Sequence, residues 1–425
     1  MEDTIFALSS GAPPAAIATI RISGPRAGIV LDRLAGGLPE PRRASYRRLK
    51  SPGGETLDHA LVLWFPGPAT ATGEDLAELH CHGGRAVVAV VEQTLAGIAG
   101  LRRATPGEFT RRAFTNGRID LNEAEGLADL LSAETELQRR SAVAMAEGAL
   151  TRQVSGWRDG VLGLSAMVEA ALDFADEDDV GDLPSAFTVQ LDALSDDIAE
   201  WLAMPRATAL REGFKVVLAG PPNAGKSTLF NALVEDEAAI TSPFEGTTRD
   251  VLARSVAIEG VPFQFFDTAG LRDETGDAIE KMGIDRARDA ARGADVVLWL
   301  GPEGRGPEGC WEIEAKADEA KGSTKRRSRH RISAVTGEGL RSLRSDLVET
   351  ARAALPRPGA VALSERQHTL LTQACEGARE AQVQDDLLLV AEGLRSARLA
   401  FDRLIGRSGT EDMLDTLFGR FCIGK

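Results

Sequence analysis

The sequence predicts an α/β plus all-α architecture, in which an N-terminal α/β domain precedes a helical domain and a second α/β unit is inserted among the helices. Short β-like runs alternate with helices over residues 1–118. Apolar residues recur at helical spacing between 122 and 204, and again between 365 and 404. Between these stretches, the apolar run 214–219 leads into a glycine-rich turn. Because neither helical stretch alone is expected to enclose a core, the two should form one domain around the inserted unit.

The domain boundaries are predicted where these patterns change. The N-terminal domain spans 1–118, and the first part of the helical domain spans 119–212. The inserted unit covers 213–352, and the second helical part covers 353–425. A length of 425 residues is compatible with about three domains.

The inserted unit begins with a complete phosphate-binding loop. Residues 220–228 read Gly-Pro-Pro-Asn-Ala-Gly-Lys-Ser-Thr and directly follow the apolar run. Backbone N–H groups in such a loop can surround a polyphosphate at the start of a helix. We expect Lys226 to reach the β and γ phosphates and Ser227 to place its hydroxyl on Mg²⁺.

Two further segments have the form of nucleotide-dependent switches. Segment 246–250 supplies Thr248, which could complete the Mg²⁺ shell opposite Ser227. Asp267 ends an apolar run and is placed to hold the metal's water, while the N–H of Gly270 could sense the γ-phosphate. The segment therefore predicts a Ras-like P-loop GTPase domain. The predicted GTP contacts are Asn223, Ala224, Gly225, Lys226, Ser227, Thr228, Ser242, Thr247, Thr248, Asp267, Thr268, Ala269, Gly270, Asp318, Ser333 and Ala334.

The guanine-reading motif is incomplete. GTPases usually carry Asn-Lys-x-Asp, and residues 315–318 read Ala-Lys-Ala-Asp. Asp318 can still accept from the guanine N1 and N2 donors, and Ser333 with Ala334 has the form of the loop that touches the base. Losing the Asn should weaken binding by roughly 0.5–1.5 kcal/mol. Residues 310–314 are short and charged, so no strand is predicted before the motif, and the base-binding side should be trimmed.

A catalytic base must come from an unusual position. Leu271 stands where small signalling GTPases place the Gln that orients the attacking water. Glu280, which opens the next predicted helix, is the candidate; the alternative is a solvated glutamate at a helix start. The side-chain carbonyl of Asn223 could hold a monovalent cation.

Composition limits the possible settings and partners. The chain has no run of 18 uncharged apolar residues and no signal peptide, so we expect a cytoplasmic protein without a membrane partner. Its four cysteines lack metal-like or disulfide-like spacing, and zinc is not expected at 80–82. The net charge is −15, so any RNA contact must use local patches. The three basic tracts are 42–50, 102–118 and 325–331.

Several motifs together resemble one known family. They are 222–227, 246–250, 267–272 and the terminal Phe-Cys-Ile-Gly-Lys of 421–425, with 20–24, 73–84 and 106–117 nearer the N-terminus. The combination of a phosphate loop with a chain-ending Cys-Ile-Gly-Lys is highly specific. The sequence resembles the MnmE/TrmE family of tRNA uridine-5-carboxymethylaminomethyl modification GTPases, and the likeness runs through the full chain.

The resemblance implies a GTP-hydrolysing enzyme that acts on tRNA. Such an enzyme works with a flavin-dependent partner of the MnmG/GidA type to add a carboxymethylaminomethyl or aminomethyl group at C5 of the wobble uridine, position 34. It forms a homodimer through its N-terminal domain and a heterotetramer with the partner. It binds 5,10-methylene- or 5-formyl-tetrahydrofolate, while FAD enters only through the partner.

The resemblance also implies ligand contacts. The implied folate contacts are Arg21, Glu78, Arg118 and Lys425. The implied K⁺ contacts are Asn223, Ser242, the Phe244 carbonyl and Thr247. Arg118 stands where the family often has Lys, and Ser242 where Thr is common. For Cys422, a nucleophile and a packing residue both remain possible, and Glu78 could instead form an ion pair inside the α/β domain.

Two other functions are compatible with parts of the sequence. One is a ribosome-assembly or RNA-binding switch GTPase, although the folate-like N-terminal segment and the Cys-Ile-Gly-Lys ending argue against it. The other is a scaffold that is catalytically silent because its base-reading motif is degraded. A GTP turnover assay separates the scaffold from an enzyme.

Overall fold

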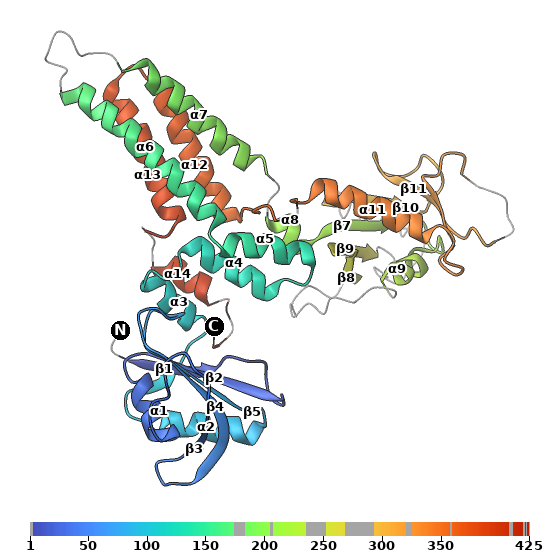
Figure 1. Cartoon of the computed structure of the whole chain (residues 1–425). Helices are drawn as coiled ribbons and strands as arrows, with labels where there is room; N and C mark the ends of the chain where they lie inside the picture. The colour runs from blue at the N-terminus through green and yellow to red at the C-terminus, as the bar shows by residue number, and fades with distance from the viewer. Residues whose placement is uncertain are drawn as a thin grey trace. The chain divides into compact units, whose positions relative to one another are not determined.

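The structure is a computed structural model, and the chain divides into two compact units. The described residues are 3–173, 183–204, 207–234, 252–267, 293–319, 325–357, 359–407, 411–419, 421 and 423–424. The first unit combines Met1–Ala128 with Asp402–Lys425, and the second is Asp129–Phe401. Figure 1 labels the elements of both units. The three boundaries that the sequence predicts between its four segments stay predictions.

The first unit is built on a six-stranded sheet with the order β3-β4-β5-β2-β1-β6. Its strands are β1 (Thr4–Leu8), β2 (Ile17–Ser23), β3 (Ser45–Lys50), β4 (Thr56–Phe65), β5 (Leu76–His82) and β6 (Leu101–Arg103). All pairs are antiparallel except β1 with β6. Apolar residues alternate along the strands, so one face packs on α1 (Ala27–Ala35) and α2 (Arg85–Ala96). The opposite face carries Arg21 and Glu78, which are register partners.

The end of the chain belongs to this first unit. Helix α3 (Glu108–Thr115) packs against α14 (Glu411–Phe418), where the rings of Phe114 and Phe418 lie 5.9 Å apart. Gly107 has φ +69°, and a Cβ there would lie 2.1 Å from the Phe418 carbonyl oxygen, so only glycine allows this approach. Beyond α14, the Ser9 hydroxyl donates to the Gly424 carbonyl at 2.8 Å. The C-terminal segment therefore reaches the end of β1.

The helices of the second unit come from two segments of the sequence, one before and one after the strands of the second sheet. Its helices are α5 (Glu136–Ala146), α6 (Ala149–Asp173), α7 (Ser185–Leu202), α8 (Ala207–Glu212), α12 (Glu365–Gln382) and α13 (Leu387–Leu404), with α4 (Leu121–Ser132) crossing from the first unit. Figure 1 shows α6 and α7, in green, beside α12 and α13, in red. Trp157 of α6 packs edge-on against Trp201 of α7 and stacks on Phe401 of α13. Residues far apart in the sequence thus share one helical core.

The second sheet has the strand order β12-β11-β10-β7-β9-β8. Its strands are β7 (Phe214–Ala219), β8 (Leu252–Ile258), β9 (Val261–Asp267), β10 (Val296–Trp299), β11 (Trp311–Glu314) and β12 (His330–Arg331). All pairs are parallel except β8 with β9. Helices α9 (Lys226–Val234) and α11 (Leu340–Ala354) pack apolar faces on the same core cluster. The phosphate loop therefore leaves β7 in the middle of the sheet, where ligands bind in doubly wound folds.

The prediction that no strand precedes residues 315–318 is wrong. Strand β11 pairs in parallel with β10, with Leu298 opposite Trp311. Trp311 and Ile313 are buried, while the glutamate between them reaches Lys325 at 2.6 Å, so its charge does not prevent the strand. The base-binding side of this sheet is nonetheless reduced, as predicted, because residues 300–310 form loops and turns without a helix.

Candidate nucleotide and folate sites

The phosphate loop joins β7 to α9 through backbone angles that only some residues accept. Gly220, Asn223 and Gly225 have φ of +150°, +62° and +94°. Asn is among the non-glycine residues that tolerate this left-handed region. Helix α9 then starts at Lys226, so the amide groups of its first turn face the loop. This geometry is that of an anion cradle at a helix N-terminus.

Lys226 is buried inside this loop. It is 6% exposed, and its Nζ donates to the carbonyl oxygens of Gly220 and Pro221, each at 2.8 Å. Burial lowers the pKa of Lys226, and the charge of Asp267 opposes that shift. The ammonium group is thus held at the loop where a bound phosphate would compete for it.

Ser227 and Asp267 meet beside Lys226. Asp267, at the end of β9, is 2% exposed, and it accepts a 2.7 Å hydrogen bond from the Ser227 hydroxyl. The two residues lie 40 positions apart, and the parallel pairing of β7 with β9 brings them together. A hydroxyl and a carboxylate are hard oxygen donors of the kind that Mg²⁺ accepts together with phosphates and water. The donor set therefore fits Mg²⁺ at the position that the sequence predicts.

Several of the residues that the sequence predicts to read the base line a small cavity of about 110 Å³. It is lined from α9 by Thr228, from the loop after β11 by Ala315, Lys316 and Asp318, and from the loop after β12 by Ala334. Asp318 is exposed, and the hydroxyl of Ser333 donates to its carboxylate and lowers its pKa. Asp318 is therefore an ionised acceptor at the mouth of the cavity, as guanine reading requires.

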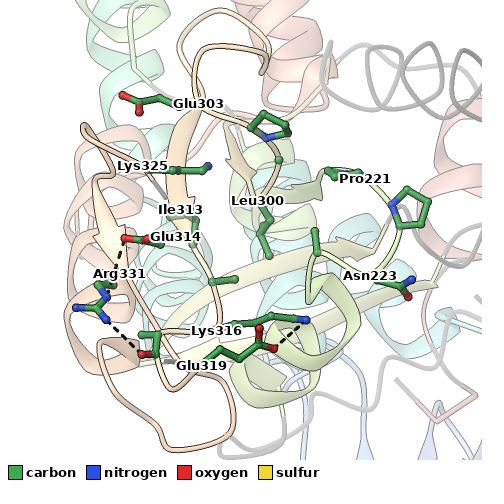
Figure 2. Close-up of a pocket in the computed structure, with 16 residues that line it drawn as sticks. Pro221, Asn223, Leu300, Glu303, Ile313, Glu314, Lys316, Glu319, Lys325 and Arg331 are labelled. Carbon is green, nitrogen blue, oxygen red and sulfur yellow. Dashed lines mark hydrogen bonds and ion pairs between the residues drawn. The ribbon is translucent and has the colours of Figure 1, made fainter. Parts of the chain in front are cut away.

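Lys316 also lines a larger cavity of about 460 Å³ (Figure 2). Asn223 of the phosphate loop, Leu300 and Ile313 line it. Lys316 forms an ion pair with Glu319 at 3.1 Å and lines both cavities. The cavity opens beside the helix-free loop after β10.

In the first unit, two of the predicted folate contacts are already paired. Glu78 accepts from Arg21 at 2.9 and 3.1 Å and contacts the His80 ring at 3.1 Å. Burial would raise the pKa of Glu78, but the hydrogen bonds from His80 and Arg21 and the charge of Arg21 lower it overall. Arg118 is exposed, and its Nε donates to the Thr70 carbonyl at 3.1 Å. Both interpretations of Glu78 are compatible with this geometry, because the paired side chains are mostly buried, at 27% and 16% exposure, but keep some contact with solvent.

Comparison with known proteins assigns a family to these sites. The family model of the MnmE helical domain matches residues 121–422, and that of the GTP-binding protein TrmE N-terminus matches residues 4–118. The tRNA modification GTPases MnmE of Novosphingobium aromaticivorans and Erythrobacter litoralis are each 62% identical, over 437 and 423 aligned residues. Both alignments cover 100% of this chain and 100% of the relative.

The chain belongs to the MnmE family of tRNA modification GTPases. As a member of this family it is a GTP hydrolase, and the ribosome-assembly alternative is not favoured. Among solved structures, the G domain of the T. maritima FeoB iron transporter matches with a TM-score of 0.22 and 26% identity, over 32% of this chain and 98% of that chain. A TM-score this low carries no weight, so the fold of the nucleotide unit rests on its own strand order.

Several residues predicted from family motifs lie outside the described residues. They are Ser242, Phe244, Thr247, Thr248, Thr268, Ala269, Gly270, Glu280, Cys422 and Lys425. The described part of the nucleotide site consists of the phosphate loop, Asp267 and the base-reading loops.

A buried charge cluster in the first unit was not predicted. Arg112 is fully buried and contacts Asp3, Glu74 and Glu108 at 2.8, 3.0 and 3.2 Å. Arg102 forms a further close ion pair with Glu108. The sequence signal was the spacing of Glu108 and Arg112, four residues apart on one helix face. Much of tract 102–118 is therefore structural, and it is a weaker RNA candidate than its composition suggested.

The two histidines of the His-Cys-His segment at 80–82 each have a carboxylate partner. His80 contacts Glu78 and His82 contacts Asp58, and no cluster of three metal-ligating side chains occurs among the described residues. Burial, with the nearby charge of Asp58, raises the pKa of the Cys81 thiol to about 12. Within the same described part of the chain, no helix is long and apolar enough to cross a membrane.

Proposed function

We propose that this chain is the cytoplasmic GTPase subunit of a tRNA-modifying enzyme that acts at C5 of the wobble uridine, position 34. With a flavin-dependent MnmG/GidA-like partner it would add a carboxymethylaminomethyl or aminomethyl group, using a one-carbon tetrahydrofolate. The observation that supports the proposal is that one chain of this family combines two features. Ser227 contacts Asp267 at the start of the phosphate-loop helix, and the first unit holds both the Arg21–Glu78 ion pair and the C-terminal Gly424.

Phosphate binding in this proposal depends on residues that are already preorganised. Lys226 would exchange its two carbonyl contacts for the β and γ phosphates, while the loop amides hold the remaining oxygens. Ser227 and Thr248 would hold Mg²⁺, and Asp267 would hold one of its waters. The metal supplies charge neutralisation on the β and γ oxygens.

Water activation is assigned to Glu280, because Leu271 cannot orient a water molecule. A K⁺ ion held by Asn223, Ser242, the Phe244 carbonyl and Thr247 would supply the positive charge that an arginine finger supplies elsewhere. The position of Asn223 supports this assignment, because this residue lines the cavity beside the phosphate loop (Figure 2).

The folate is assigned to the first unit. A pterin with a glutamate tail needs an acid for its amino-pyrimidine edge and cations for its carboxylates. Glu78 and Arg21 provide this chemistry on neighbouring strands, and Arg118 adds a second cation, which is exposed. Lys425 directly follows Gly424, whose carbonyl is held by Ser9 at the end of β1. We therefore place 5,10-methylene- or 5-formyl-tetrahydrofolate on this face of a homodimer that forms a heterotetramer with the partner.

Mass spectrometry of tRNA tests the proposed function. A strain lacking this chain should accumulate tRNA with an unmodified C5 at uridine 34, and the wild-type chain should restore the modification. The Lys226→Ala variant should not restore it. Normal modification at position 34 in the deletion strain would refute the proposal.

A further inference from the structure

The structure separates the three basic tracts by how much of their charge is neutralised. In tract 102–118, Arg102, Arg103, Arg111 and Arg112 form ion pairs, whereas Arg118 forms none with the described residues. In tract 325–331, Lys325, Arg329, His330 and Arg331 have acidic partners, and Arg326 and Arg327 have none among the residues that the structure describes. In tract 42–50, Arg47, Arg48 and Lys50 form no ion pair within the described part of the chain, although Arg43 pairs with Glu40. Tract 42–50 thus keeps the largest free positive charge of the three.

This free charge lies on an edge strand beside an exposed aromatic ring. Strand β3 pairs only with β4, and it forms one edge of the first sheet (Figure 1). Leu49 points into the core, whereas Tyr46 and Arg48 lie on the opposite face. Tyr46 is 69% exposed, and its ring stacks on His59 of β4 at 5.8 Å between centroids. We call Tyr46, Arg48, Lys50 and His59 the β3 patch.

Protection of the sheet edge explains only part of the β3 patch. Charged residues and a bulge on an edge strand prevent pairing with another sheet, and a register shift occurs between Leu49 and Lys50. An exposed tyrosine does not serve that purpose, because it adds apolar surface at the same edge. Single-stranded nucleic acid uses this combination, since cations contact phosphates while an aromatic ring stacks on a base.

We propose that the β3 patch binds an unpaired segment of the tRNA substrate. Arg48 and Lys50 contact backbone phosphates, and a base stacks on Tyr46, whose ring is held in place by His59. The net charge of −15 makes general RNA binding unfavourable, so a local uncompensated patch sets where RNA can approach. The inference rests on the proposed function for the identity of the RNA.

The test measures binding of an unmodified tRNA transcript to the full chain by fluorescence anisotropy at several salt concentrations. The double variant Arg48→Ala/Lys50→Ala should weaken binding and lower the slope of log K against log salt by about 0.7 for each lost phosphate contact. The matched control is Arg326→Ala/Arg327→Ala, which removes the same charge from two exposed arginines that have no ion pair with the described residues. It should leave affinity and slope near wild type.

Single variants of Tyr46 test the stacking. Tyr46→Ala should weaken tRNA binding by about five-fold or more, while Tyr46→Phe keeps the ring and should bind like wild type. Equal losses in the two double variants would overturn the assignment. A change of Tyr46→Ala from dimer to monomer in light scattering would also overturn it, because the face would then be an interface between copies of the chain.

The experiments can contradict the RNA-binding proposal and the proposed function independently of each other. If the patch variants lose tRNA affinity but the deletion strain keeps a modified position 34, the proposed function is wrong while the RNA site stands. If position 34 depends on the chain but both double variants bind tRNA equally, the β3 patch is wrong and the function stands.

Discussion

Ala315 shows how one residue can change nucleotide affinity without changing the fold. It lies against the phosphate loop, 3.7 Å from where a Cβ on Gly225 would stand, and it lines the base cavity. An alanine there offers no hydrogen bond to a purine. Asp318 remains as the ionised acceptor on the same cavity. The site should therefore prefer guanine but hold it weakly.

We predict that Ala315→Asn tightens GTP binding by roughly two- to ten-fold, which corresponds to one recovered hydrogen bond. Titration with a fluorescent GTP analogue measures the change. Ala317→Asn is the matched control, because residue 317 does not line the base cavity. An unchanged affinity in Ala315→Asn would mean that another residue holds this edge of the base.

Glu108 makes the stability of the first unit depend on pH. Burial would raise its pKa, but hydrogen bonds from Arg102 and the Thr105 N–H, with the charges of Arg102 and Arg112, lower the pKa to about 2. Because the folded pKa lies below the ordinary value of 4.5, the stabilisation is complete above about pH 4.5. It is lost as the pH falls toward about 2.

We predict that Glu108→Gln lowers the free energy of unfolding at pH 7 by on the order of 3 kcal/mol, the equivalent of this shift. The difference between wild type and variant should shrink between about pH 4.5 and 2 in denaturant titrations. The control is Glu92→Gln. Glu92 pairs with the exposed Arg103, so this substitution should lower the free energy of unfolding much less. A pH-independent difference would contradict the charge assignment.

At the scale of elements, local motifs were easier to predict than strands that depend on distant partners. The phosphate loop follows from nine consecutive residues, 220–228, and the structure has the predicted strand, turn and helix there. The sequence predicted that Ser227 and Asp267 serve one metal site, and the structure brings the two side chains into direct contact.

Strand β11 was missed because its two glutamates look unfavourable in a short strand. Their partners, Lys325 and Arg331, lie more than ten residues away, so no local pattern reveals the compensation. The buried position of Arg112 was missed for the same reason, since Asp3 and Glu74 come from distant segments.

The pairing of β2 with β5 carries the proposed folate contacts. We predict that Glu78→Ala abolishes binding of 5-formyl-tetrahydrofolate in calorimetry and abolishes tRNA modification, while GTP hydrolysis stays near wild type because the nucleotide unit has a separate core. His80→Gln is the control, because it removes a neighbour of Glu78 but keeps the carboxylate and its arginine. Unchanged folate binding in Glu78→Ala would mean that the ion pair of Arg21 with Glu78 has only a structural role.

At the scale of the whole molecule, each compact unit draws on distant parts of the sequence. The last helix of the first unit, α14, comes from the C-terminal end of the sequence. In the second unit, α6 and α7 share a core with α12 and α13, although the strands of the nucleotide-binding sheet lie between them in the sequence. Helical spacing predicted these helices, but it could not place the division at residues 128 and 402, because that division depends on which helices share a core. The C-terminal segment is accordingly part of the first unit.

GTP turnover by the purified full chain tests the central claim most directly. With Mg²⁺ present, we predict hydrolysis of GTP that is faster in K⁺ than in Na⁺, and that falls by about 10²-fold or more in Glu280→Ala, a typical contribution of a general base. Lys226→Ala defines the background, because it removes the cation that the phosphate loop holds. Turnover of the wild-type chain no higher than that background, in either salt, would contradict the account and leave a silent scaffold.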